Sequence, residues 1–239
     1  MLKQKMFEAI VFRILNPLLT KTIRIFFSHG NCPFYESSEA PDLRPLEDHW
    51  KILRQELDVL MLEKSKIPGF HEISKEQLPI TNDDRWKTFF FWAYGQKIEK
   101  NCARCPKTAA LLETIPRMTT AMFSILSGNK HIPPHRGPFK GVLRYHLALW
   151  VPKDRERCRI RVGKEIAHWQ EGKALLFDDT HEHEVWNDTP EDRVVLFLDL
   201  LRPLPFPFSM FNRFVMRQIS KTSFIQDSLR NLHAWKEPA

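Results

Sequence analysis

Residues 142–151, VLRYHLALWV, decide the fold, because apolar side chains alternate there with other residue types. Side chains along a β-strand point alternately to its two faces. Leu143 and Leu147 therefore share one face of this strand with the other odd-numbered residues. Arg144 and His146 share the opposite face, and such side chains need a ligand or a buried partner if they point into a small barrel. The alternative is a face that is open to solvent.

The same alternation recurs along the chain from about residue 85. It predicts further strands at Trp86–Ala93, Ala121–Leu126, Cys158–Val162, Ala174–Phe177 and Val194–Leu200. Successive strands joined by short turns favour an antiparallel sandwich or a jelly roll. Apolar residues between 46 and 60 recur at helical spacing, and Pro106 suits the first turn of another helix. The fold class is therefore mainly β with flanking helices.

Length and charge limit the range of functions. The 239 residues, 43% of them hydrophobic, suffice for one sizeable domain. The net charge of +7 belongs to the ends: residues 1–28 have five basic residues against one acidic, and residues 202–239 have six against two. The intervening part is balanced, which argues against a nucleic-acid groove across the body. Four unevenly spaced cysteines favour a reducing compartment, so we expect a cytoplasmic protein.

Both ends of the chain have a basic amphipathic pattern. Apolar pairs between residues 6 and 27 recur near the helical period with basic residues among them, which predicts a pair of helices broken near Pro17. Residues 206–221 have a related pattern. No run is long enough for a transmembrane span, and Arg13 argues against a secretory signal. Such ends are typical of peripheral contact with an anionic membrane, here on its cytoplasmic face; the alternative is that both helices cover the core.

Histidines are dense in the strand-rich region, above all in Phe177–Trp186. Asp179, His181 and His183 have the same parity, so an extended segment would project a carboxylate and two imidazoles to one side. This donor set suits a divalent metal such as Fe(II). The polar stretch 187–192 predicts a turn that returns Arg193 to the neighbourhood of Trp186. The distance would accommodate a small dicarboxylate between the metal and the guanidinium.

An ordered series of motifs resembles one enzyme family. The series comprises HRGP at 135–138, LRYHL at 143–147, CRIR at 158–161, WQEG at 169–172, FDD at 177–179, HEVW at 183–186 and Arg193. It resembles the aspartyl/asparaginyl β-hydroxylase family of Fe(II)- and 2-oxoglutarate-dependent oxygenases over about residues 85–203. The resemblance implies a double-stranded β-helix, which is a cupin-like jelly roll, holding one iron. It divides the chain into an N-terminal helical region (1–84), the oxygenase core (85–203) and a basic amphipathic tail (204–239).

The resemblance also implies roles for individual residues. His135 and His183 would be the iron ligands. Arg193, assisted by Ser124, would bind the distal carboxylate of 2-oxoglutarate. Arg144 and His146 match the family's cosubstrate-binding Arg-x-His pair, which agrees with their shared strand face.

Gly137 departs from the usual two-histidine, one-carboxylate iron site, which has an acidic residue at this position. The peptide-hydroxylating branch of the family resembles this chain in having Gly here, whereas lipid A acyl-chain hydroxylases have Asp. LRYHL and the basic tail look more like the lipid branch. Either Asp179 or water would complete the iron site; we favour Asp179 as a residue that orients a ligand and count it among the catalytic residues. His181 is a weaker candidate for a substitute ligand.

These inferences predict a dioxygenase that uses Fe(II), 2-oxoglutarate and O₂ to hydroxylate an unactivated C–H bond. The first expected substrate is the β-carbon of an aspartyl or asparaginyl residue or a related amino acid. One alternative is a lipid A-type fatty acyl 2-hydroxylase at the membrane surface. Others are a β-helix that binds without catalysis and a membrane-associated scaffold. The expected partners are a peptide, amino-acid or lipid substrate, and no nucleic acid.

Overall fold

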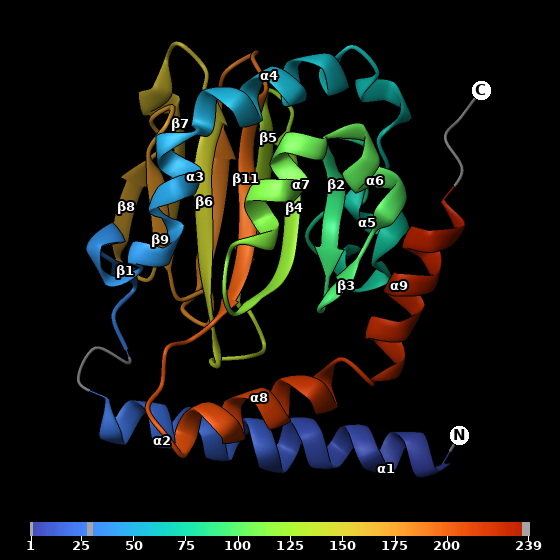
Figure 1. Cartoon of the computed structure of the whole chain (residues 1–239), viewed down its shortest axis with the longest axis vertical. Helices are drawn as coiled ribbons and strands as arrows, with labels where there is room; N and C mark the ends of the chain where they lie inside the picture. Colours follow the sequence, from blue (N-terminus) through green and yellow to red (C-terminus); the bar gives the residue numbers. More distant parts are fainter. Residues whose placement is uncertain (1, 28–30, 236–239) are drawn as a thin grey trace.

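Two antiparallel β-sheets form the centre of the molecule (Figure 1). The computed structural model describes residues 2–27 and 31–235. The larger sheet has the strand order β1 (Phe34–Tyr35), β9 (Ala174–Phe177), β6 (Val142–Trp150), β11 (Arg193–Leu201), β4 (Met118–Leu126), β2 (Trp86–Ala93) and β3 (Gln96–Lys97). The smaller sheet has the order β5 (Lys130–His135), β10 (His183–Asn187), β7 (Cys158–Val162) and β8 (Glu165–His168).

The chain passes back and forth between the sheets. β4 lies in the larger sheet, β5 in the smaller, β6 in the larger, β7 and β8 in the smaller, β9 in the larger, β10 in the smaller and β11 in the larger. This winding is the double-stranded β-helix, or jelly roll, and it confirms the predicted fold class. The larger sheet also includes β1, from the N-terminal region. The division into residues 1–84, 85–203 and 204–239 stays a prediction.

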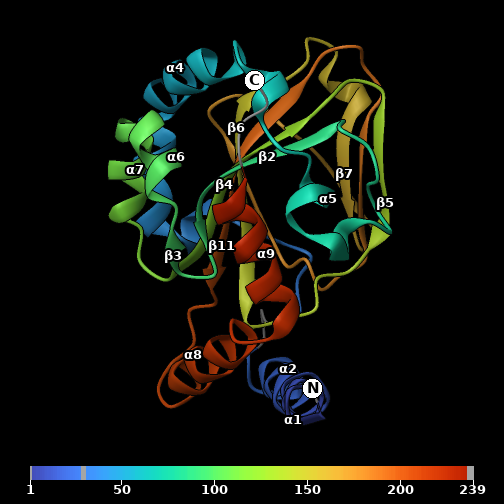
Figure 2. The same cartoon turned by 90° about the vertical axis from the view of Figure 1, so that its right-hand side faces the viewer.

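The two faces of the larger sheet have different neighbours. Its outer face is covered by α3 (Arg44–Asp48), α4 (Trp50–Met61), α6 (Glu99–Arg104) and α7 (Pro106–Glu113) (Figures 1 and 2). Leu53 and Leu57 of α4 belong to one buried cluster with Leu143 and Leu147 of β6. Ala148, from the other face of β6, belongs to the cluster between the sheets. The predicted alternation is therefore confirmed from residue 142 to residue 149. It is wrong for Trp150 and Val151, which follow a register shift and pack on the opposite faces from those expected.

Two helical segments form one end of the molecule (Figure 1). The first runs through α1 (Leu2–Ile10), a π-helical turn (Val11–Leu15) and α2 (Asn16–Phe26) without interruption; the second is α8 (Phe208–Ile219). The predicted break near Pro17 is wrong. The N–H of Asn16 bonds to the carbonyl of Val11, and Pro17, which has no N–H to donate, lies in the first turn of α2.

Two further helices lie at the open side between the sheets (Figure 2). These are α5 (Phe70–Ile73) and α9 (Ser223–Ala234), and Asn231 of α9 donates a 3.0 Å hydrogen bond to the carbonyl of Ile73. Within the described residues, no helix has both the length and the apolarity to cross a bilayer. Short 3₁₀ turns occur at Ser37–Glu39, Pro41–Leu43, Lys64–Lys66, Lys75–Gln77 and Arg155–Arg157.

Candidate active site

A cavity of about 620 Å³ lies between the two sheets and reaches the helices at their open side. All seven predicted site residues line it: Ser124, His135, Arg144, His146, Asp179, His183 and Arg193. They come from β4, β5, β6, β10, β11 and the turn after β9. Residues far apart in the sequence therefore meet because the chain alternates between the sheets.

His135 and His183 face each other across the pairing of β5 with β10. They are register partners, and their ring centroids are 4.1 Å apart. Nδ1 of His135 lies 2.8 Å from the carbonyl of Pro133, and Nδ1 of His183 lies 3.0 Å from the carbonyl of His181. These bonds place the ring proton on Nδ1 and leave Nε2 of each ring as the atom that can bind a metal.

Burial keeps both imidazoles neutral. It lowers the pKa of His183 to about 3, with smaller contributions from His135 and Arg144, and it also lowers the pKa of His135. Neutral imidazole is the form that binds a metal ion. The pair is therefore ready to bind at neutral pH.

The segment from Phe177 to Trp186 is not extended throughout, so the condition for Asp179, His181 and His183 to share one side is not met. β9 ends at Phe177, and β10 begins only at His183. Between them, the carboxylate of Asp178 accepts hydrogen bonds from both the N–H and the hydroxyl of Thr180, which fixes a tight turn. Because the turn interrupts the alternation, His181 is not among the residues that line the cavity.

Asp179 occupies the space beside Gly137. The N–H of Gly137 donates a 2.7 Å hydrogen bond to the carbonyl of Asp179, and a Cβ atom at residue 137 would overlap the Asp179 carboxylate. Burial raises the pKa of this carboxyl to about 6, although Arg144 lies beside it and opposes the shift. Residue 137 has no acidic side chain of its own, but the carboxylate of Asp179, from the connection between β9 and β10, occupies the space where such a side chain would begin.

The charge of Arg144 is balanced. Its Nη2 lies 2.9 Å from Asp179, and its Nε donates a 2.9 Å hydrogen bond to Asp199. Asp199 is its register partner on β11, and the guanidinium also lies over the ring of Phe197 at 4.4 Å. Two carboxylates and an aromatic face therefore hold this side chain.

Arg193 is buried, with 1% of its surface exposed, and its charge is not balanced. Among the described residues no carboxylate pairs with it, and Nε and Nη1 have no hydrogen-bond partner. It lies 4.5 Å from the ring of Trp169 and beside the thiol of Cys158, and burial lowers its pKa to about 10. An unpaired buried guanidinium is costly, so this position fits an anion that arrives from outside.

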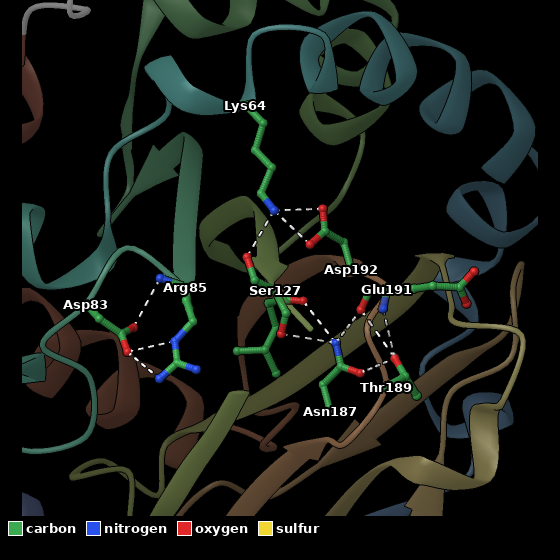
Figure 3. A network of polar contacts seen from close by, with 9 residues as sticks. Lys64, Asp83, Arg85, Ser127, Asn187, Thr189, Glu191 and Asp192 are labelled. Carbon is green, nitrogen blue, oxygen red and sulfur yellow. Dashed lines mark hydrogen bonds and ion pairs between the residues drawn. The ribbon is translucent and has the colours of Figure 1, made fainter. Parts of the chain in front are cut away.

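The turn before Arg193 is held by a polar network (Figure 3). The side-chain amide of Asn187 donates to the carbonyls of Leu126, Ser127 and Glu191. Lys64 pairs with Asp192 at 2.7 Å. These contacts fix where β11 begins and hence where Arg193 stands.

The predicted return of Arg193 to the neighbourhood of Trp186 is not a hairpin. β10 pairs with β5 and β7 in the smaller sheet, whereas β11 pairs with β4 and β6 in the larger. The turn carries the chain across the cavity instead. Arg193 and the histidine pair therefore belong to opposite sheets.

His146 and Ser124 complete the polar lining. Both ring nitrogens of His146 are buried without a hydrogen-bond partner, and burial lowers its pKa well below the usual value. Its ring packs against Phe177 and Phe197. Ser124 accepts a 3.0 Å hydrogen bond from the indole N–H of Trp86.

The residues fit Fe(II) and a dicarboxylate. Within residues 2–27 and 31–235, no group of three or more His, Cys, Asp or Glu side chains is arranged to hold a metal. His135 and His183, whose rings face each other, are the residues that would hold an iron ion. The unmatched donors of Arg193 fit a carboxylate, and neutral His146 has free nitrogens for a polar ligand.

The aspartyl/asparaginyl β-hydroxylase family matches residues 47–203, which include every strand of the β-helix. This chain belongs to that family. The two histidines and the unpaired arginine lie within the matched residues and line one cavity.

Relatives of this chain are named for different substrates. An ornithine lipid ester-linked acyl 2-hydroxylase from Rhizobium tropici is 45% identical over 208 residues, which are 87% of this chain and 74% of that protein. The aspartyl/asparaginyl β-hydroxylases of mouse and human are 38% and 37% identical over 166 residues, 67% of this chain. The match covers only 22% and 21% of those two proteins.

A solved oxidoreductase of the 2OG-Fe(II) oxygenase family from Burkholderia pseudomallei is similar with a TM-score of 0.37. It is 13% identical over 49% of this chain and 68% of its own.

The outer part of the cavity was missed by sequence reasoning. Its walls include apolar side chains from helices outside the β-helix, namely Phe12, Phe70, Ile73, Phe224, Leu229 and Leu232, beside the polar residues Ser74, Glu76, Gln77 and Ser228. The amphipathic pattern of both chain ends was a signal that these helices have a buried face. It did not show that part of this face lines the cavity between the sheets.

Proposed function

We propose that this chain is an Fe(II)- and 2-oxoglutarate-dependent hydroxylase that acts on the acyl chain of a membrane lipid. The observation that carries the oxygenase part is the buried, unpaired guanidinium of Arg193 in the same cavity as the facing pair His135 and His183. The apolar outer cavity supports the acyl substrate.

His135 and His183 would hold the iron through Nε2, and Arg193 would bind the far carboxylate of 2-oxoglutarate. His146 and Arg144 would orient the nearer end of the cosubstrate. Bound Fe(II) with 2-oxoglutarate supplies the redox chemistry that makes O₂ an oxidant for an unactivated C–H bond. Asp179, oriented by Arg144, keeps Oδ1 without a protein partner, so this oxygen can accept a hydrogen bond from water or ligand at the site.

The acyl substrate is supported by the walls of the outer cavity. Phenylalanine and aliphatic side chains from three separate helical segments converge there, and they outnumber the polar residues beside them, Ser74, Glu76, Gln77 and Ser228. The similarity to a relative named as a lipid acyl 2-hydroxylase covers most of this chain. Water exclusion by the same walls would protect the reaction from side products.

An aspartyl or asparaginyl side chain is the second candidate substrate. It is favoured by Gly137, the feature that resembles the peptide-hydroxylating branch, and by the similarity to the mammalian β-hydroxylases. The lipid remains our proposal because Gly137 has a local reason here: the carboxylate of Asp179 fills the space of a side chain.

The test is succinate release from 2-oxoglutarate by the purified chain with Fe(II) and ascorbate. Parallel reactions contain a bacterial lipid extract or an aspartate-containing peptide, and mass spectrometry identifies which gains an oxygen atom. His183→Ala should abolish turnover. The matched control is His131→Ala, since His131 is half-exposed and stacks on Trp186 without lining the cavity. If the intact protein binds no iron and releases no succinate, the proposed enzymatic function is overturned, and a β-helix that binds without catalysis is the remaining explanation.

A further inference from the structure

The helical segment α1–α2 has a buried row and an exposed row of apolar side chains. Val11, Leu19 and Ile23 are fully buried. On the other side, large apolar side chains recur at a spacing of four or seven residues and are 42–62% exposed: Met6, Ile10, Ile14, Leu18 and Ile25. A surface helix of a soluble domain normally turns polar residues outward. The exposed row therefore needs an explanation.

The helix α8 repeats this arrangement. Val215 and Ile219 are buried, whereas Met210 and Phe214 are 61% and 48% exposed. α8 lies beside α2 at the same end of the molecule (Figure 1), where the rings of Phe26 and Phe208 stack at 6.0 Å. We call the exposed residues of α1–α2 and α8 the basal surface.

The charge of the basal surface has one sign. Seven exposed basic side chains lie in the two segments or directly after α8, and none forms an ion pair within the described part of the chain: Lys5, Arg13, Lys21, Arg24, Arg213, Arg217 and Lys221. Glu8, the one acidic residue in 2–27, instead accepts a 2.7 Å hydrogen bond from the N–H of Ser223 at the start of α9. The partner that complements this surface is both apolar and anionic.

The same helix also reaches the cavity. Phe12 lines it, and its ring lies 5.7 Å from that of Phe224 on α9. Phe12 belongs to the π-helical turn Val11–Leu15, and the neighbouring Ile10 and Ile14 are exposed on the basal surface. One turn of helix thus joins the exposed apolar row to the wall of the cavity.

We propose that the basal surface docks on an anionic lipid bilayer and that acyl chains enter the cavity past Phe12 and Phe224. This inference rests on the proposed function, whose substrate it places in the membrane. Exposed apolar side chains would enter the acyl boundary, and the basic side chains would contact anionic headgroups. A second copy of the chain fits less well, because it would bring two surfaces of the same charge together.

The test is flotation of the full chain with vesicles of phosphatidylglycerol or of phosphatidylcholine. The chain should float with the anionic vesicles and remain largely unbound with the neutral ones. Replacing Arg13, Lys21 and Arg24 together by Gln should lower the partition coefficient about 100-fold, since each basic residue near such a surface contributes about fivefold. Ile14→Glu with Phe214→Glu should abolish flotation.

The matched control is Val59→Glu with Leu62→Glu on and after α4, which are 68% and 85% exposed and lie outside the basal surface. This variant should float like the wild type. Equal flotation of all variants, or no flotation of the wild type, overturns the proposal. A different result would also overturn it: the wild type is a dimer and binds no vesicles, and Ile14→Glu with Phe214→Glu makes it a monomer. The basal surface would then be a contact between two copies of the chain.

Succinate release in the absence of lipid separates this proposal from the proposed function. The basal variants should retain the slow turnover of 2-oxoglutarate without substrate at the wild-type rate. If the wild type does not float but releases succinate normally, only the docking proposal is overturned. If it floats normally but releases no succinate, only the proposed oxygenase function is overturned. Hydroxylation of vesicle lipid, but not of detergent-dispersed lipid, should fall in the basal variants.

Discussion

Arg144 and Arg193 are two arginines in one cavity with opposite surroundings. Arg144, with 19% of its side chain exposed, pairs with Asp179 and Asp199. Arg193 is 1% exposed and pairs with no carboxylate in the described residues. A protein stabilises a buried charge with partners of its own unless another molecule supplies them. Arg144 is therefore already paired within the protein before any ligand binds, whereas Arg193 has donors that an anionic ligand could satisfy.

The same substitution at the two arginines should have opposite effects on stability. Arg144→Met leaves two carboxylates without their cation and should lower the free energy of unfolding by about 3 kcal/mol. Arg193→Met replaces an unpaired buried charge by an apolar side chain of similar length, so the ligand-free protein should keep or gain stability. Urea denaturation of both variants measures this. If both substitutions destabilise the protein equally, the two arginines do not differ in how the protein stabilises their charges.

A substitution at Gly137 tests the position of Asp179, one of the two carboxylates that pair with Arg144. Gly137→Ala places a methyl group against the Asp179 carboxylate and should cost about 1–3 kcal/mol of unfolding free energy. In an Asp179→Ala background the same change should cost much less, because the overlapping group is gone. The double-mutant cycle therefore gives a coupling energy. Additive effects would show that the two residues do not compete for this space.

A substitution at Ser124 tests its expected help to Arg193, and the expected change in unfolding free energy is smaller. Ser124→Ala removes the acceptor of the Trp86 indole N–H and should lower the free energy of unfolding by about 1–2 kcal/mol. Ser124→Thr keeps a hydroxyl and serves as the control. A loss that is equally large in ligand-free and 2-oxoglutarate-bound protein would assign Ser124 to Trp86 alone. A larger loss in the bound protein would support its expected help to Arg193.

Much of the β-helix could be predicted because strand alternation is local. The predicted strands correspond to β2, β4, β6, β7, β9 and β11. β5 was missed because Pro133 and Pro134 argue against a strand; they are tolerated because β5 lies at the edge of the smaller sheet. β10 was merged with the turn before it, where the side chain of Asp178 bonds to Thr180.

The seven candidate site residues were predicted from motifs, and all of them line one cavity in the structure. Their pairing could not be predicted, because it depends on register. Asp199 meets Arg144 only because β11 pairs with β6 in one register, and Asp179 meets Gly137 across a connection between strands. The apolar outer cavity depends on helices from both chain ends, and no local pattern specifies how they pack.

The most direct test compares 2-oxoglutarate with 2-oxopentanoate, which lacks the far carboxylate, by calorimetric titration of Mn(II)-loaded protein. The wild type should bind 2-oxoglutarate at least about 30-fold more tightly, because a buried charge pair contributes about 2 kcal/mol or more. Arg193→Met should bind the two ligands almost equally. A variant that keeps the wild-type discrimination, or a wild type that shows none, would contradict the assignment of Arg193 to the far carboxylate.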